Sequence, residues 1–148
     1  TIVGDGPDAA QFRAQVERLG LSSAVRFIPG MPARKAFALG RLFVAPSRAE
    51  SLPYIVIEAA AAAVPMLTTN VGGIPEVFGP QAASLVAPDD ASALARSIAA
   101  ALGEPERIGR EALTLRARVQ SGFSAQVMAD AVLAAYGEAL LKFRAQTN

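Results

Sequence analysis

Two glutamates lie in or beside the most apolar part of this 148-residue sequence. Seven residues separate Glu50 from Glu58, and between Leu52 and Pro65 only Glu58 is neither apolar nor proline. Burying a carboxylate costs free energy unless another group pairs with it or hydrogen-bonds to it. Glu58 is therefore the first place to look for a ligand.

The residues before Glu50 predict where it lies in the fold. Residues 42–45 form an apolar run without alternation, typical of a strand buried on both faces, and Ser47, Arg48 and Glu50 follow that run. In an open α/β sheet, ligands bind beyond the carboxyl ends of the strands. We therefore expect Glu50 to lie at a ligand-binding edge.

A helix is expected over residues 53–63, directly after this loop. Ser51 is expected to be its N-cap, and Pro53 is tolerated in a first turn. Amides at the start of a helix lack intrahelical acceptors and can bind a phosphate. The amides expected to do so belong to Leu52, Tyr54 and Ile55.

The pattern around the two glutamates allows two interpretations. One carboxylate could accept hydrogen bonds from sugar hydroxyls while the other holds a second polyol. Equally, Glu50 could be solvated in a loop and Glu58 could reach solvent at the edge of the fold. The spacing alone does not favour either interpretation.

A second candidate site lies near the N-terminus. Gly4-Asp5-Gly6-Pro7-Asp8-Ala9 fits the G-x-G-x-x-[G/A] pattern of dinucleotide-binding loops, between an expected strand and an expected helix. The fingerprint also requires an acidic residue after the next strand, and residues 25–28 lead only to Pro29 and Gly30. A tight strand-to-helix turn is favoured, and a phosphate cradle remains the alternative.

Composition excludes several kinds of chemistry. The chain has no cysteine and no histidine, which excludes disulfides, thiolate metal sites and a histidine general base. The net charge of +1 gives no indication of a nucleic-acid partner. No apolar run is long enough for a transmembrane helix, and the N-terminus is unlike a signal peptide. The sequence also lacks an initiator methionine and begins within an expected strand, so we expect a piece of a longer protein.

Alternating strand and helix patterns predict the fold class. Strands are expected over residues 2–3, 25–28, 42–45, 65–69 and 84–87, with helices between them and three helices over 91–102, 106–121 and 125–143. This order is typical of βαβ units and a parallel sheet. We predict one α/β domain over residues 1–148, a Rossmann-like doubly wound parallel sheet ending in flanking helices.

Four motifs in order resemble a known enzyme family. They are Val3-Gly4-Asp5-Gly6-Pro7, Val25-x-Phe27-x-x-Gly30, Pro46-Ser47-x-x-Glu50-x7-Glu58-Ala59 and Val64-Pro65-x-x-x-Thr69-x-Val71-Gly72-Gly73-x-x-Glu76. Together they resemble the C-terminal, donor-binding domain of retaining glycosyltransferases of the GT-B fold, family 4 type. The resemblance extends from the first residue to about Ala87 and is weaker in the terminal helices.

This resemblance implies roles for the two glutamates. Glu58 would hydrogen-bond the ribose hydroxyls of the donor nucleotide. Glu50 would contact the transferred sugar and stabilise an oxocarbenium-like transition state. The diphosphate would bind at the start of the helix, at Ser51, Leu52, Tyr54 and Ile55.

The resemblance also assigns residues outside this stretch and includes departures. Met31 falls where the family packs the base, and Gly72 and Gly73 would line the cleft, although a tight turn explains the two glycines nearly as well. The family often has Gly-Phe-Gly after its first glutamate, where this chain has Ser51, Leu52 and Pro53. Pro53 cannot donate an N–H, so phosphate contacts must come from its neighbours.

The resemblance further implies that part of the active site lies outside this chain. The first strand of the domain, a basic phosphate-binding pair and the whole N-terminal acceptor domain are expected to precede Thr1. The donor would be a UDP- or GDP-sugar used without a metal or other cofactor. The acceptor would be a glycan or lipid-linked glycan, and the enzyme would be cytoplasmic, with peripheral association at the inner face of the membrane.

Two further functions remain open. The chain could be a non-catalytic nucleotide- or dinucleotide-binding module that uses Gly4 and Gly6. It could also be a fragment of a nucleotide-sugar epimerase, a related class with the same GT-B architecture. The sequence of the N-terminal half would distinguish the epimerase from the transferase.

Overall fold

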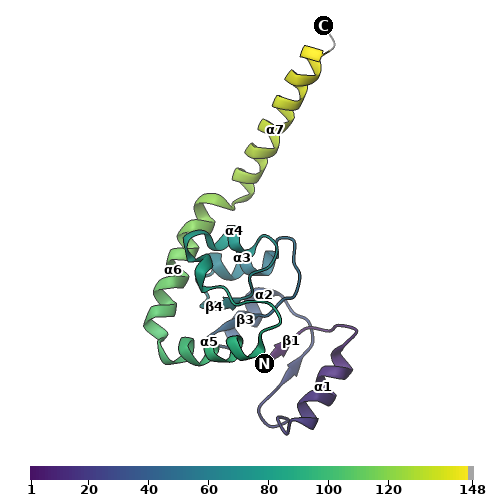
Figure 1. Ribbon diagram of the computed structural model, residues 1–148, viewed down its shortest axis with the longest axis vertical. Helices are drawn as coiled ribbons and strands as arrows, with labels where there is room; N and C mark the ends of the chain where they lie inside the picture. The colour runs from purple at the N-terminus through teal and green to yellow at the C-terminus, as the bar shows by residue number, and fades with distance from the viewer. Residues whose placement is uncertain (147–148) are drawn as a thin grey trace.

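The computed structural model describes residues 1–146, with side chains up to residue 143 (Figure 1). The strands are β1 (Ile2–Val3), β2 (Phe27–Ile28), β3 (Phe43–Ala45) and β4 (Met66–Thr68). The helices of the first half are α1 (Ala9–Arg18), α2 (Ala33–Ala36), the 3₁₀ helix η1 (Phe37–Leu39) and α3 (Tyr54–Ala61). The helices that follow are α4 (Ile74–Phe78), the 3₁₀ helix η2 (Gly79–Ser84), α5 (Ala91–Gly103), α6 (Pro105–Gly122) and α7 (Ala125–Gln146).

All strand pairs in the described residues are parallel, as predicted. β1 pairs with β2, with Ile2 opposite Phe27, and β3 pairs with β4, with Val44 opposite Leu67. The strand expected over residues 84–87 is reduced to one parallel bridge between Thr69 and Val86. The expected sheet is therefore present as two separate parallel pairs, with the bridge extending the second.

The core lies where α3 packs against α6 and α4. Val56 and Ala60 of α3 are fully buried, and Leu115 and Val119 of α6 lie in the same apolar cluster. The aliphatic residues of α3 give it a wide apolar surface, which explains why this short helix forms inside the fold. This packing fixes the helix whose first turn carries the candidate site.

Side-chain hydrogen bonds cap the first turns of α5 and α7. The Ala93 amide donates to the Asp90 carboxylate (2.7 Å), and the Val127 amide donates to the Ser124 hydroxyl (3.2 Å). Each cap satisfies an amide that the first turn would otherwise leave without an acceptor. The expected boundaries of these helices hold to within a few residues.

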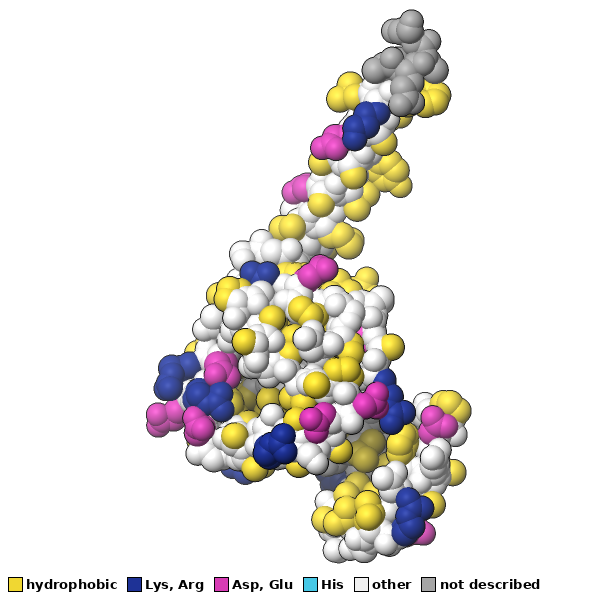
Figure 2. Space-filling model, viewed as in Figure 1, with side chains coloured by type: hydrophobic (Ala, Val, Ile, Leu, Met, Phe, Trp, Pro, Cys, Tyr) yellow, Lys and Arg dark blue, Asp and Glu magenta, His cyan; other side chains and the backbone are white. Residues whose placement is uncertain are grey.

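The terminal helix does not flank the sheet as predicted. α7 projects away from the rest of the molecule, and hydrophobic side chains are exposed along it (Figures 1 and 2). These exposed residues include Met128, Leu133, Tyr136, Leu140 and Leu141. Within residues 1–146, none of the helices combines the length and apolarity needed to cross a bilayer.

Candidate functional site

Glu50 lies in the loop that follows the carboxyl end of β3. The Ser47 hydroxyl donates a hydrogen bond to the Glu50 carboxylate (2.9 Å). The Ser47 carbonyl in turn accepts from the hydroxyl of Thr69 (2.5 Å), which follows β4 and is only 3% exposed. Thr69, at the end of β4, therefore orients the Glu50 carboxylate, at the end of the neighbouring strand β3, through Ser47.

Gly72 and Gly73 press against the backbone of the same loop. The Gly73 amide donates to the Ser51 carbonyl (2.6 Å). A Cβ at Gly72 would lie 1.9 Å from the Glu50 carbonyl oxygen, and the φ of +52° at Gly72 is one that other residues adopt rarely. The glycine pair is thus required by close backbone approach, and it fixes the position of Glu50 and Ser51.

The N-terminus of α3 differs from the prediction at Ser51. Pro53 is the N-cap residue, no side chain caps the helix, and Ser51 lies two residues earlier, where its carbonyl accepts from Gly73. The prediction of Ser51 as N-cap is therefore wrong. The close approach of Gly73 holds Ser51 outside the helix, and proline favours the extended backbone that Pro53 adopts before Tyr54.

The first turn of α3 offers fewer amides than expected. The amides of Tyr54 and Ile55 lie within it, without intrahelical acceptors, and the Val56 amide donates to the Pro53 carbonyl (3.0 Å). Leu52 lies before the helix. The structure thus provides two unpaired amides at the positive end of α3, beside the Glu50 loop.

Glu58 is exposed, which overturns the expectation that it lies in a buried segment. Its neighbours Val56, Ala59 and Ala60 carry the buried side of α3, and Glu58 lies on the other side. Tyr54 and Glu58 are four residues apart and share the exposed face of the helix. The Glu58 carboxylate therefore lies one turn beyond the free amides and is open to a ligand.

Arg48 and the residues around the start of α5 lie at one side of the carboxyl edge of β3 and β4. The Arg48 guanidinium forms an ion pair with the Asp89 carboxylate (2.6 Å), with both side chains largely exposed. Beside them lies a pocket of about 200 Å³ at the ends of β3 and β4. It is lined by Pro46, Arg48, Thr69, Ala87, Asp89, Asp90, Ala91 and Leu94.

The Gly4 to Gly6 loop has a structural role in the described residues. The Asp5 carboxylate accepts a hydrogen bond from the Gly30 amide (2.9 Å), which joins the ends of β1 and β2. Met31 follows this contact and is half-buried. Among the described residues no hydrogen bond links Met31 to the Glu50 loop, so its role at the site stays a prediction.

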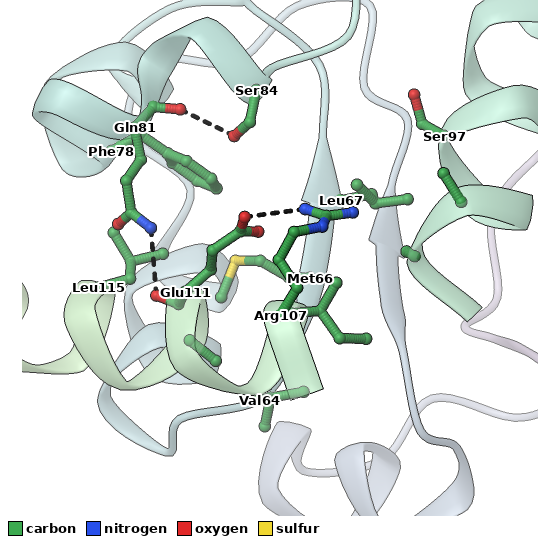
Figure 3. A pocket seen from close by; sticks show the side chains of 14 residues that line it. Val64, Met66, Leu67, Phe78, Gln81, Ser84, Ser97, Arg107, Glu111 and Leu115 are labelled. Carbon is green, nitrogen blue, oxygen red and sulfur yellow. Dashed lines mark hydrogen bonds and ion pairs between the residues drawn. The ribbon is translucent and has the colours of Figure 1, made fainter. Parts of the chain in front are cut away.

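A different pocket, drawn in Figure 3, lies near the amino end of β4 and not at the edge that carries Glu50. Arg107 in its wall donates to the carboxylates of Glu104 (2.7 Å) and Glu111 (2.8 Å). Hydrogen bonds to Glu104 and then to Glu111 raise the pKa of Arg107 above its ordinary value. Arg107 and the two carboxylates therefore neutralise one another in this wall.

Sequence reasoning missed three contacts that position the site. The bond from Thr69 to Ser47, the approach of Gly72 to Glu50, and the ion pair between Arg48 and Asp89 all join residues distant in sequence. Two weak signals were present: a threonine ending an apolar strand and a glycine pair just beyond it. Neither signal identifies its partner.

The parallel strand pairs and a helix N-terminus at their carboxyl edge define a Rossmann-like α/β domain of the GT-B kind. Its backbone is similar to that of a sucrose-phosphate synthase from Thermosynechococcus elongatus, with a TM-score of 0.80, 24% identity, and coverage of 95% of this chain and 38% of that one. This likeness supports the assignment of the chain to the GT-B fold.

The chain belongs to the family of glycosyl transferases group 1, which it matches over residues 1–104. It is 31% identical over 140 residues to a glycogen synthase from Mycobacterium tuberculosis, covering 92% of this chain and 34% of the relative. It is 32% identical over 132 residues to a D-inositol 3-phosphate glycosyltransferase from Gordonia bronchialis, covering 86% of this chain and 29% of the relative. The chain thus spans about a third of the length of these curated relatives.

Proposed function

We propose that this domain binds a nucleotide-diphosphate sugar, a UDP- or GDP-sugar, at the carboxyl edge of β3 and β4. The observation that carries the proposal is that the Glu50 loop and the N-terminus of α3 are held side by side by Thr69, Gly72 and Gly73. A donor of this class has two parts with different needs, a diphosphate that requires hydrogen-bond donors and hydroxyls that require acceptors. This edge offers both.

The diphosphate would bind at the start of α3. The free amides of Tyr54 and Ile55 and the positive end of the helix dipole favour an anion there. The Leu52 amide and the Ser51 hydroxyl, in the loop just before, would add donors from outside the helix. Amide dipoles and basic groups elsewhere in the complete protein would then stabilise the leaving diphosphate without a metal.

The two carboxylates would take separate parts of the donor. Glu58, exposed one turn into α3, would accept hydrogen bonds from the ribose hydroxyls, and Met31 would pack on the base. Glu50 would contact hydroxyls of the transferred hexosyl group and stabilise positive charge that develops at its anomeric carbon. The hydrogen bond from Ser47 fixes the rotamer of Glu50 for that role.

The rest of the reaction would depend on polypeptide outside residues 1–148. An N-terminal domain would hold a glycan or lipid-linked acceptor and supply basic residues for the diphosphate, and transfer would retain the anomeric configuration. The isolated domain would then bind donor without transferring it. We place the complete enzyme in the cytoplasm, associated peripherally with the inner face of the membrane.

The test uses the complete protein with radiolabelled UDP- and GDP-hexoses and a glycan acceptor mixture. Glu50→Gln should abolish transfer of the sugar and leave nucleoside diphosphate affinity within about threefold, because the carboxylate acts on the sugar and not on the nucleotide. The dinucleotide alternative predicts the opposite: Gly6→Val would abolish nucleotide binding and Glu50→Gln would be silent. Epimerised nucleotide sugar without transfer would support the epimerase class.

A further inference from the structure

The last turn of α4 is held by a side chain from another helix. Arg118, on α6, donates from Nε to the Val77 carbonyl (3.0 Å) and from Nη2 to the Glu76 carbonyl (2.9 Å). A helix of only five residues leaves its final carbonyls without intrahelical donors, and an arginine can satisfy them. Arg118 therefore fixes the end of α4 that lies farther from the Glu50 loop.

Gly79 makes room for this contact. It follows α4 directly with a φ of +55°, a conformation that residues other than glycine rarely adopt. A Cβ at Gly79 would overlap the guanidinium carbon of Arg118. The turn that ends α4 thus has the one residue type that lets the guanidinium reach the helix carbonyls.

The opposite end of α4 reaches the candidate site. The helix begins directly after Gly73, whose amide donates to the Ser51 carbonyl (2.6 Å), and Gly72 packs against the Glu50 backbone. Five residues at a rise of about 1.5 Å each span only about 7.5 Å, so this helix moves as one piece. A displacement of its last turn is therefore passed to the glycine pair and to the Glu50 loop.

Apolar packing leaves part of the position of α4 unspecified. The helix lies against α6 (Figure 1), where Ile74 and Val77 are buried in one cluster with Leu115 and Val119. Hydrophobic burial is non-directional, so it holds α4 on this surface without fixing how far the helix slides or turns there. The two hydrogen bonds from the planar guanidinium of Arg118 are directional and fix both.

We propose that Arg118 is a positioning residue for sugar transfer, which sets the place of the Glu50 carboxylate through α4 and the glycine pair. The inference rests on the proposed function, because Glu50 is assigned there to the transferred sugar. The guanidinium of Arg118 is committed to the carbonyls of α4, so it acts on the reaction only through that helix.

Steady-state transfer by the complete protein tests the proposal. Arg118→Met should lower kcat at least about tenfold and leave the KM for the donor within about twofold, because a misplaced Glu50 is felt in the transition state. Arg116→Met, which changes an exposed arginine of the same helix, should leave both parameters unchanged. Equal kcat values for the two variants would overturn the proposal.

Amide hydrogen exchange in the complete protein separates this role from a general loss of stability. The Gly73 amide, bonded to Ser51, should exchange at least about tenfold faster in Arg118→Met than in the unmodified protein. The Phe43 amide, bonded to the Pro65 carbonyl beside β4 (2.9 Å), should exchange at an unchanged rate. Equal acceleration of both amides would mean that Arg118 only stabilises the fold, against the proposal.

The two measurements together distinguish failure of this inference from failure of the proposed function. Absence of transfer by the unmodified complete protein would overturn the proposed function, whatever the Arg118 variant does. Normal transfer by Arg118→Met would overturn the positioning role and leave the proposed function standing. Slower transfer together with faster exchange at Gly73 alone is the result that the proposal predicts.

Discussion

Glu58 shows how exposure and function combine at the scale of a residue. The carboxylate lies on the open side of α3, so it is available to a ligand at no cost in burial. The apolar stretch around Glu58 suggests burial on every side, and this suggestion is wrong because only one face of α3 is covered. A helix with one covered face can have an exposed glutamate among buried alanines.

Glu58→Ala should weaken nucleoside diphosphate binding about tenfold to a hundredfold, the range for hydrogen bonds to a charged group. Calorimetric titration measures it, with Glu17→Ala, an exposed glutamate on α1, as the control. Removing the ribose hydroxyls from the ligand should weaken binding to the unmodified protein and have little effect in Glu58→Ala. Equal losses in the two proteins would contradict the ribose assignment.

Thr69 positions Glu50 through Ser47, and a substitution of the same shape separates this role from packing. Thr69→Val in the complete protein should lower kcat for transfer at least about tenfold with a nearly unchanged KM for the donor, because Glu50 loses its orientation in the transition state. Thr69→Ser should restore kcat. If kcat falls equally with serine and with valine, the positioning role is wrong.

Thr68 supplies the matched control for that experiment. Its hydroxyl is buried and has no hydrogen-bond partner among the described residues. Thr68→Val should therefore leave kcat unchanged and be neutral or stabilising in thermal unfolding, since it removes an unpaired buried polar group.

Gly72 is the position where the loop tolerates least change. Gly72→Ala should lower the free energy of unfolding by about 1–3 kcal/mol, because alanine is strained at this φ and its Cβ would overlap the Glu50 carbonyl. Chemical denaturation measures the change. Gly109→Ala, inside α6 with open space around it, should instead stabilise by about 0.5–1 kcal/mol.

At the scale of elements, α3 both packs the core and presents its first turn to a ligand. The sequence predicts the helix well, because an apolar run with proline at its start leaves few alternatives. It places the cap wrongly at Ser51, because the residue that decides the cap is Gly73, more than twenty positions away. The conformational preferences of neighbouring residues do not reveal contacts between loops that are distant in sequence.

Tyr54→Pro tests the phosphate role of this helix N-terminus. Proline is favoured at the first helical position, and Pro53 already has the extended backbone that a following proline requires, so the fold should persist. The variant lacks one amide donor and should bind a nucleoside diphosphate about tenfold more weakly, with unchanged affinity for the nucleoside. Tyr54→Ala, which keeps the amide, should bind both as the unmodified protein does; a loss equal to that of Tyr54→Pro would assign the effect to the tyrosine ring.

At the scale of the whole molecule, the sequence predicts the α/β class, the parallel pairing and the family. Strand and helix periodicity, together with motifs in a fixed order, carry this information within short windows. The separation into two strand pairs and the projection of α7 could not be predicted. Both depend on contacts between segments that are distant in sequence, and periodicity does not report such contacts.

The described residues are expected to form only part of the donor-binding site. The described residues bring together acceptors and amide donors at the edge of β3 and β4, whereas the one arginine in that loop is paired with Asp89. The positive charge that a diphosphate needs would come from elsewhere in the complete protein. This division is consistent with a domain that spans about a third of its relatives' length.

The most direct test of the central claim is a map of nucleotide-induced amide shifts. The ¹⁵N-labelled protein is titrated with UDP, GDP and the corresponding nucleosides, and backbone resonances are followed. We predict that the diphosphates shift Tyr54, Ile55 and Glu58 most, with Gly72 and Gly73 following through the Glu50 loop. Shifts confined to Gly4, Asp5 and Gly6 would contradict the account and assign nucleotide binding to the loop that follows β1.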